Sequence, residues 1–90
     1  MKRDYNDPVY KEWRTRIFKR DKFKCQMPSC GRKTRLNAHH IVKWSSAPHL
    51  RYDEYNGITL CQYCHKQVTN HEHMYESLFM DIVRSNNAKS

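Results

Sequence analysis

Four cysteines are the feature that most limits how this chain can fold. They form two close pairs far apart in the sequence, Cys25 with Cys30 and Cys61 with Cys64. A chain of 90 residues buries little apolar surface, and only 38% of these residues are hydrophobic, so a cross-link or a bound metal is needed for stability. Two local pairs of thiolates suit a closed tetrahedral zinc site. We therefore expect a structural zinc ion held by all four cysteines.

Two other uses of the cysteines are a pair of disulfides and a redox-active Cys-x-x-Cys. The first residues, Met1 to Asn6, include no apolar segment that would direct export, so we expect a cytoplasmic protein with reduced thiols. A redox motif would leave the second pair unexplained. The sequence also lacks an apolar run long enough to span a membrane. Zinc is the use that accounts for all four cysteines in a chain with reduced thiols.

The positive charge lies almost entirely in the first part of the chain. The chain has 17 Lys and Arg against 9 Asp and Glu, a formal charge of +8, and residues 1–35 hold 12 of the basic and 4 of the acidic residues. A local basic surface suits a polyanion, although a solvated helix face with a basic tail would give the same count. We expect phosphate contacts from Lys11, Arg14, Lys19, Arg20, Arg32, Lys33 and Arg35.

The two ends of the chain each predict a helix. At residues 8–20, Asp7 can cap the helix and Pro8 suits its first position, while an apolar stripe is expected from Val9, Trp13 and Ile17. At about residues 70–84, Thr69 and Glu72 match a capping box. The apolar stripe of this second helix is expected from Met74, Leu78 and Ile82, widened by Phe79 and Val83. The polar residues from Ser85 onward are expected to be disordered.

Between these helices the sequence predicts two strands, a long loop and a short helix. Pro28 and Gly31 mark a tight knuckle around the first cysteine pair. A strand is expected at residues 36–42 and another at 58–60, with a helix from Cys61 to about Val68. The loop between the strands, residues 43–55, has no clear periodicity. We expect it to be held to the core by Trp44, Leu50 and Tyr52, and to end at an Asn56-Gly57 turn.

Several separated motifs in one order resemble the HNH endonuclease family. They are Asn37-Ala38-His39-His40-Ile41-Val42 and Asn56-Gly57-Ile58-Thr59-Leu60-Cys61-Gln62-Tyr63-Cys64-His65, preceded by Trp13-Arg14, Lys19-Arg20-Asp21 and Lys24-Cys25. The resemblance covers roughly residues 13–68. It implies a single α+β domain over residues 1–90. Its core would be a small ββα-metal (His-Me finger) fold, stapled by the four-cysteine zinc and flanked by N-terminal and C-terminal helices.

The resemblance also implies roles for particular residues. His40 matches the general base that activates water, and Asn56 matches the residue whose amide holds the long loop and orients that base. His39 and His65 match the ligands of the catalytic ion. Neighbours on a regular strand point to opposite faces, so His39 and His40 can serve one site only where the strand ends or bends. Taken alone, the Asn-Gly pair would be no more than a turn, His39 or His40 would be structural, and His65 could replace one cysteine on the zinc.

The sequence departs from the family pattern at one position. Many relatives carry a further histidine one helical turn after the position of His65, and here that position is Thr69. Two histidines with water and phosphate suit Mg²⁺ or Mn²⁺ better than tightly bound zinc. His71 and His73 have the wrong spacing and are expected at the surface.

The function implied by the resemblance is a divalent-metal-dependent endonuclease that nicks or cleaves DNA. Such a protein would contact DNA mainly through backbone phosphates, with weak sequence preference. Small relatives of this kind are often phage proteins. The competing interpretations are a non-catalytic zinc-ribbon module that binds nucleic acid, and a subunit of a larger packaging or restriction assembly. The zinc-ribbon module would share the cysteines and the basic surface, but it gives no reason for His39, His40, Asn56 and His65 to occur together. The subunit would be active only in company with its partners.

Overall fold

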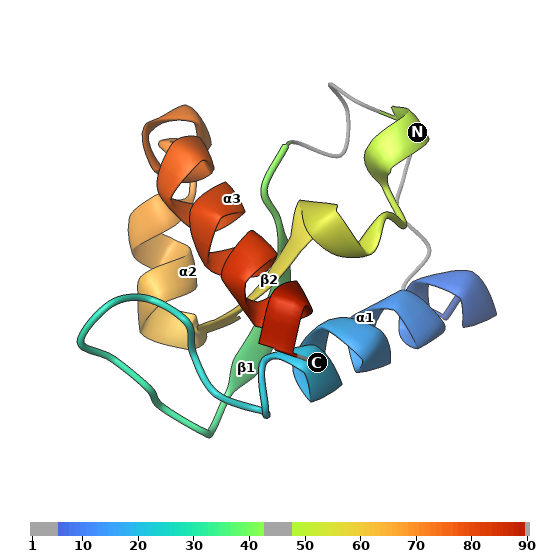
Figure 1. Ribbon diagram of the computed structural model, residues 1–90, viewed down its shortest axis with the longest axis horizontal. Coiled ribbons are helices and arrows are strands. Elements are labelled where there is room, and N and C mark those ends of the chain that lie inside the picture. The colour runs from blue at the N-terminus through green and yellow to red at the C-terminus, as the bar shows by residue number, and fades with distance from the viewer. Residues whose placement is uncertain (1–5, 43–47, 90) are drawn as a thin grey trace.

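The computed structural model describes residues 6–42 and 48–89. Its elements are α1 (Pro8–Arg20), β1 (Leu36–His40), the short 3₁₀ turns η1 (Pro48–Leu50) and η2 (Glu54–Asn56), β2 (Gly57–Cys61), α2 (Gln62–Val68) and α3 (Glu72–Lys89). Figure 1 shows the two strands at the centre with the helices arranged around them. Two strands followed by α2 form the ββα arrangement that the resemblance implied, and the α+β prediction is confirmed.

The sheet is a single antiparallel pair of strands. Leu36 lies opposite Cys61 at one end, and His40 lies opposite Gly57 at the other. Beyond this last pair, the Ile41 N–H donates to the Asn56 carbonyl oxygen at 3.1 Å. β1 therefore ends at His40, two residues earlier than predicted. This register brings the adjacent histidines next to the start of β2.

Helix α1 has the predicted bounds. The Asp7 side chain accepts a hydrogen bond from the Val9 N–H at 2.9 Å, and Pro8 occupies the first turn. Its buried stripe is turned by one residue from the prediction, because Tyr10 is buried with Trp13 and Ile17 whereas Val9 is 50% exposed. Buried residues that are three and then four positions apart lie on one face of a helix just as residues four apart do, so the sequence allowed either stripe.

The prediction of an Asn56-Gly57 turn is wrong. Glycine at position 57 serves instead to leave space for the packing of α1. Asn56 ends η2, and Gly57 begins β2 with an extended backbone at φ −135°. A Cβ on Gly57 would lie 2.5 Å from Cζ2 of Trp13 and 2.7 Å from Cδ1 of Ile17. The absence of a side chain at this position therefore lets α1 pack directly against β2.

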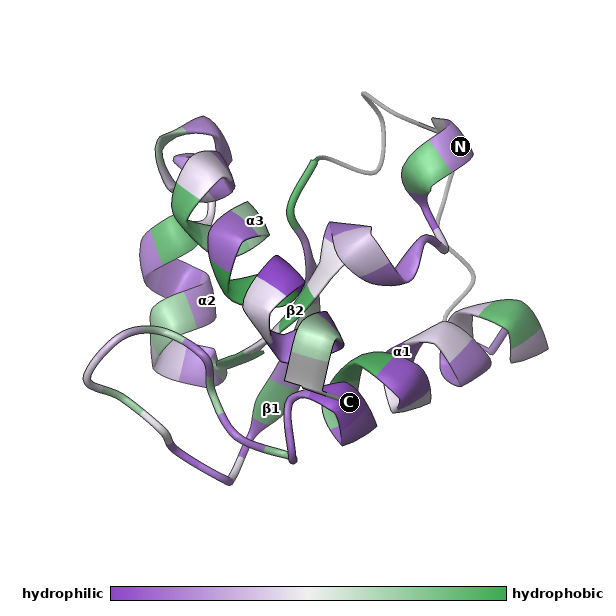
Figure 2. Cartoon of the chain, viewed as in Figure 1, coloured by the Kyte–Doolittle hydropathy of each residue, from purple (hydrophilic) through white to green (hydrophobic). Residues whose placement is uncertain are grey.

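The larger part of the core lies between the sheet, α2 and α3. Ile58 and Leu60 of β2 are fully buried with Phe79 and Val83 of α3. The predicted stripe on α3 is wrong at two positions, since Met74 is 69% exposed and Leu78 is 41% exposed. Two lines of residues along α3 are apolar in sequence, one with Met74 and Leu78 and the other with Phe79 and Val83. Periodicity alone could not decide which of them faces the core. Figure 2 shows apolar and polar residues alternating along the helices.

The junction between α2 and α3 corrects the predicted capping box. Thr69 follows the last residue of α2, and its hydroxyl and N–H both bond to the His65 carbonyl oxygen, at 2.7 and 3.0 Å. It therefore closes α2, and α3 begins at Glu72. A threonine after one helix and before another is ambiguous in sequence, because its side chain can satisfy either end.

The end of α3 is ordered where disorder was predicted. Residues 85–89 are helical. The Asn86 amide donates to Asp21 and to Gln26, both at 2.9 Å, and Asn87 donates to the Val83 carbonyl oxygen. The two bonds from Asn86 fasten the last turns of α3 beside the end of α1 (Figure 1).

Two further predictions concern the long loop and membranes. Tyr52 packs against the cluster of Tyr10, Trp13 and Ile17, as expected, whereas Trp44 lies outside the described residues.

In the part of the chain that the structure describes, every helix is too short or too polar to cross a membrane.

Candidate functional site

The four cysteines converge on one point. Their Sγ atoms all lie within 4.8 Å of one another, and those of Cys30 and Cys61 are 3.7 Å apart. Tetrahedral zinc with Zn–S bonds of about 2.3 Å places its sulfur ligands about 3.8 Å apart. The cysteines are thus positioned for a metal ion and fit a zinc site, which agrees with the first prediction from the sequence.

The first cysteine pair is shaped by the knuckle that the sequence predicted. The Cys30 N–H donates to the Met27 carbonyl oxygen at 3.0 Å, and the Cys25 N–H donates to the Arg32 carbonyl oxygen at 2.7 Å. Gly31 has φ +76°, a conformation that favours glycine. Gln26 then joins the knuckle to β2 through a bond from its N–H to the Thr59 carbonyl oxygen. The second pair lies at the junction of β2 and α2.

The thiols do not share one acidity. Burial raises the pKa of Cys25 and of Cys64. Burial would also raise the pKa of Cys61, but hydrogen bonds from the backbone and thiol of Cys64 and from the other thiols outweigh it and lower that pKa to about 7. Cys61 is therefore closer to its metal-binding thiolate form than Cys25 and Cys64, which release protons when a metal binds.

His40 lies at the end of β1, where two contacts fix its ring. The ring stacks on the indole of Trp13 with centroids 4.2 Å apart and planes inclined by 14°. Its Nε2 is 2.7 Å from the carbonyl oxygen of Arg51. Since a carbonyl oxygen only accepts hydrogen bonds, Nε2 carries a proton, and Nδ1 is the basic nitrogen of the neutral ring. The His40 residue is only 5% exposed, and these two contacts hold its ring in this orientation.

His39 points to the other side of β1, as the alternation of a strand requires. Its ring centroid is 5.5 Å from that of His65 on α2 and 5.9 Å from that of Phe79 on α3. This separation allows the two imidazoles to offer nitrogen atoms to one ion. β1 ends at His40, so both histidines lie in the last two positions of the strand.

Asn56 ties together the two ends of the long loop. Its side-chain oxygen accepts a bond from the Val42 N–H at 2.7 Å, while its amide nitrogen donates to the carbonyl oxygens of Val42 and Leu50 at 3.2 and 3.1 Å. Leu50 directly precedes Arg51, whose carbonyl oxygen orients His40. Asn56 itself is 2% exposed. The buried amide therefore fixes the backbone that positions the His40 ring.

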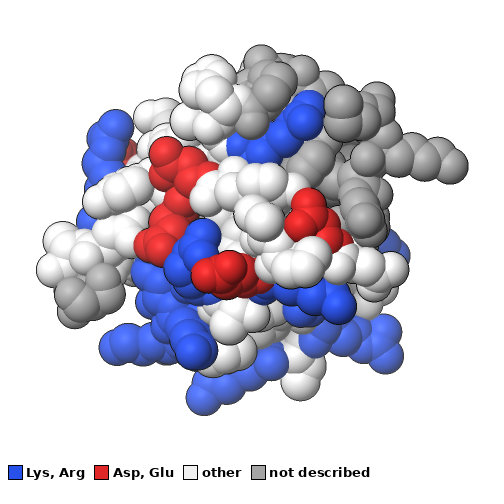
Figure 3. Space-filling model, turned by 90° about the vertical axis from the view of Figure 1, so that its right-hand side faces the viewer, with Lys and Arg blue, Asp and Glu red and all other residues white. Residues whose placement is uncertain are grey.

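Most of the residues predicted to contact phosphate lie on the surface. Figure 3 shows Lys and Arg gathered along the lower part of one face, below a band of Asp and Glu. The three surface arginines of this set also have partners within the protein, because Arg14 and Arg32 stack on the rings of Phe18 and Tyr63 and Arg35 donates to the Gln62 side chain. The exposed members of the predicted set are Lys11, Arg14, Lys19, Arg32, Lys33 and Arg35.

Arg20 is the exception, and its predicted contact with phosphate is wrong. Its side chain is only 4% exposed. The guanidinium bonds to both carboxylate oxygens of Asp21, at 2.9 and 3.0 Å, and to the carbonyl oxygens of Glu54 and Gly57, both at 2.6 Å. A guanidinium with these partners is part of the interior. The sequence does not distinguish it from the surface arginines, because Glu54 and Gly57, whose carbonyl oxygens help to enclose it, are far away along the chain.

The groups that orient His40 were not predicted from the sequence. The Arg51 contact is made by a backbone carbonyl, for which no sequence signal exists. Trp13 was expected in the core, and it is fully buried, but its stacking on His40 depends on the register between α1 and β1. His71 and His73 are exposed, as predicted from their spacing.

Comparison with known proteins gives one match. A family model described as HNH endonuclease matches residues 25–71, which is 47 of the 90 residues. The matched region contains all four cysteines, His39, His40, Asn56 and His65, whereas Trp13 and the rest of α1 lie before it. No significant match was found among curated proteins or among solved structures. With a match over more than half of its length, the chain belongs to the HNH endonuclease family.

Proposed function

We propose that this chain is an endonuclease that hydrolyses phosphodiester bonds in DNA with the help of a divalent ion. Membership of the HNH family supports a nuclease or nucleic-acid-binding role. The observation that favours catalysis is the orientation of His40. The Arg51 carbonyl oxygen holds the proton on Nε2, and Nδ1 is then the atom that takes a proton from the attacking water. A neutral imidazole can do this near neutral pH.

His39 and His65 are the proposed ligands of the catalytic ion. Their rings approach each other from β1 and α2, with centroids 5.5 Å apart. A divalent ion bound there, Mg²⁺ or Mn²⁺, would offset negative charge on the phosphate and on the leaving 3′ oxygen. A phosphate lying across the end of β1 could be reached by His39 from one side and by His40 from the other. Products with 5′-phosphate and 3′-hydroxyl ends are expected.

Asn56 is proposed to act through the backbone. By joining Val42 to Leu50 it holds the segment that carries the Arg51 carbonyl oxygen at the distance His40 requires. It is a positioning residue, with no expected contact to DNA. The exposed residues of the predicted phosphate-binding set would hold the DNA backbone, namely Lys11, Arg14, Lys19, Arg32, Lys33 and Arg35. Reduced thiols on zinc are consistent with action in the cytoplasm.

The experiment that tests this proposal separates cleavage from binding. In His40→Ala the base is removed, and in His40→Gln a side-chain amide can still donate to the Arg51 carbonyl oxygen but cannot act as a base. Both variants should lose at least about 10²-fold in cleavage of supercoiled plasmid. Both should still shift DNA on a gel and keep their zinc. His73→Ala, on the exposed side of α3, is the matched control.

The competing functions give different results in the same assay. A non-catalytic binding module, or a subunit that is active only in an assembly, would bind DNA without cleaving it with any ion. If the wild type cleaves and His40→Gln cleaves equally well, the assignment of His40 as the base is wrong.

A further inference from the structure

A pocket of about 400 Å³ lies between the end of α1, the loop that follows it and the end of α3. The rim of this pocket carries Lys19, Lys22 and Lys24, and its floor is formed by the Arg20–Asp21 pair with Gln26 and Asn86. The histidines, Asn56 and the cysteines are not among its lining residues. The pocket is thus a separate feature of the molecule.

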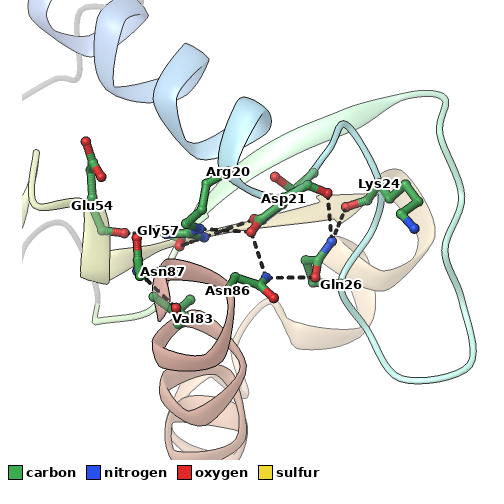
Figure 4. Close-up of polar contacts among 10 residues, drawn as sticks. Arg20, Asp21, Lys24, Gln26, Glu54, Gly57, Val83, Asn86 and Asn87 are labelled. Carbon is green, nitrogen blue, oxygen red and sulfur yellow. Dashed lines mark hydrogen bonds and ion pairs between the residues drawn. The ribbon is translucent and has the colours of Figure 1, made fainter. Parts of the chain in front are cut away.

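The floor of the pocket is rigid and electrically neutral. The buried Asp21 carboxylate pairs with Arg20 and also accepts bonds from the Thr59 N–H and the Asn86 amide, both at 2.9 Å. The Gln26 amide donates to the carbonyl oxygens of Asp21 and Lys24. Figure 4 shows this network and the Lys24 side chain pointing away from it. The floor therefore has a fixed shape without attracting ions itself.

The rim, in contrast, concentrates positive charge. Within the part of the chain that the structure describes, the side chains of Lys19, Lys22 and Lys24 form no ion pair, and the floor does not compensate their charge. The backbone is also unusual here, since Lys22 has φ +58° and Phe23 has φ +54°. Residues other than glycine rarely adopt this conformation, and such strain is often found at functional sites. The turn places two lysines within a few residues of the helix end.

We propose that this pocket binds a backbone phosphate of nucleic acid. The inference rests on nucleic acid as the partner in the proposed function, but it does not rest on catalysis. Lys11 and Arg14 are exposed on α1, and Lys11 precedes Lys19 by about 12 Å along the helix axis. Lys11 and the pocket therefore lie on the same helix, within a length of about three to four base pairs of duplex. Three ammonium groups around a neutral floor suit a phosphate dianion or a phosphodiester.

The test measures binding, so it is independent of cleavage. Affinity for a short fluorescein-labelled DNA duplex is measured by anisotropy over a range of salt concentrations, without added divalent ions. Each lost phosphate contact should make the slope of log K against log salt shallower by about 0.9. Between roughly 50 and 200 mM salt, the variant should then lose about 3.5-fold less affinity than the wild type loses. Lys22→Gln and Lys24→Gln should each show this reduction. Lys66→Gln, which removes an equal charge from the exposed side of α2, should keep the wild-type slope.

A second measurement serves if a variant does not fold. In a ¹H–¹⁵N NMR spectrum of the wild type, addition of duplex should shift the backbone amide signals of residues 19–26 and leave that of Lys66 in place. Variants with the wild-type salt slope, or unshifted signals at 19–26, would overturn the pocket assignment even if the chain cleaves DNA. Signals that respond to inorganic phosphate but not to duplex would also overturn it. Reduced slopes in a chain that binds without cleaving would support the pocket while refuting the nuclease.

Discussion

Replacing Gly57 by alanine tests whether α1 packs on β2 as described. The new Cβ would lie 2.5 Å from Cζ2 of Trp13 and 2.7 Å from Cδ1 of Ile17, both closer than van der Waals contact. The Ile17 methyl can rotate away, but the indole cannot, because Trp13 is fully buried and its Nε1 donates to the Asp53 carbonyl oxygen. To make room for the new Cβ, α1 must therefore shift away from β2 as a whole.

The expected cost can be worked out from two opposing effects. Overpacking of this kind costs about 1–3 kcal/mol. The backbone of Gly57 is ordinary for alanine, with φ −135°, so reduced freedom of the unfolded chain returns about 0.4–1 kcal/mol. The midpoints of the two ranges, about 2 and about 0.7 kcal/mol, leave a net loss in the free energy of unfolding of about 1.3 kcal/mol, or roughly 5–10 °C in Tm for a domain of this size. The displaced indole should also disturb the stacked His40 ring and reduce cleavage.

Thermal unfolding followed by circular dichroism measures this change, and Gly31 supplies the control. A Cβ on Gly31 meets no atom within 4 Å, but its φ of +76° disfavours alanine. Asparagine tolerates that backbone better than alanine, so at Gly31 the asparagine variant should be the more stable of the two. At Gly57 the order should reverse, because asparagine is larger. A Gly57→Ala protein as stable as the wild type would refute the packing of α1.

Three further perturbations have defined outcomes. Asp21→Asn leaves the buried Arg20 without its carboxylate, so urea unfolding should show a loss of about 3–5 kcal/mol, and an unchanged midpoint would contradict the buried pair. Asn56→Ala leaves the Val42 N–H without its side-chain acceptor and should cost about 1–3 kcal/mol while lowering kcat more than DNA affinity; equal loss of both would argue against a positioning role. Removing zinc with a strong chelator should unfold the chain reversibly, and chelation should become easier at lower pH because thiolates such as Cys61 are protonated; a native circular dichroism spectrum without metal would show that the staple is dispensable.

The parts of the fold that sequence predicts well are those determined by local chemistry. The Asp7-Pro8 start of α1 and the knuckle with Gly31 depend on neighbours only a few residues away. The convergence of the cysteine pairs follows from the number of ligands that zinc needs. These predictions are confirmed by the bounds of α1 and by the distances between the Sγ atoms.

The errors occur where a distant contact decides between two local possibilities. Asn56-Gly57 has the composition of a turn, but Trp13 and Ile17 across the core require a residue without a side chain. Arg20 has the composition of a surface cation, yet Asp21, Glu54 and Gly57 enclose its guanidinium. Contacts of this kind join segments more than thirty residues apart. They depend on the register of the packed elements, which local patterns do not specify.

The candidate site shows the same division. The residue types and order of His39, His40, Asn56 and His65 are visible in the sequence. The orientation of His40 is not, because it depends on a backbone carbonyl and on a ring stacked from another element.

The central claim is that the purified chain is a metal-dependent nuclease in its own right. Its most direct test is incubation of the zinc-loaded wild type with supercoiled plasmid, without added ion and with Mg²⁺, Mn²⁺ or additional Zn²⁺. We predict nicked or linear product that requires an added divalent ion and carries 5′-phosphate ends. Plasmid that stays intact with every ion, in a preparation that still shifts DNA on a gel, would contradict the claim and leave a binding module or a missing partner as the explanation.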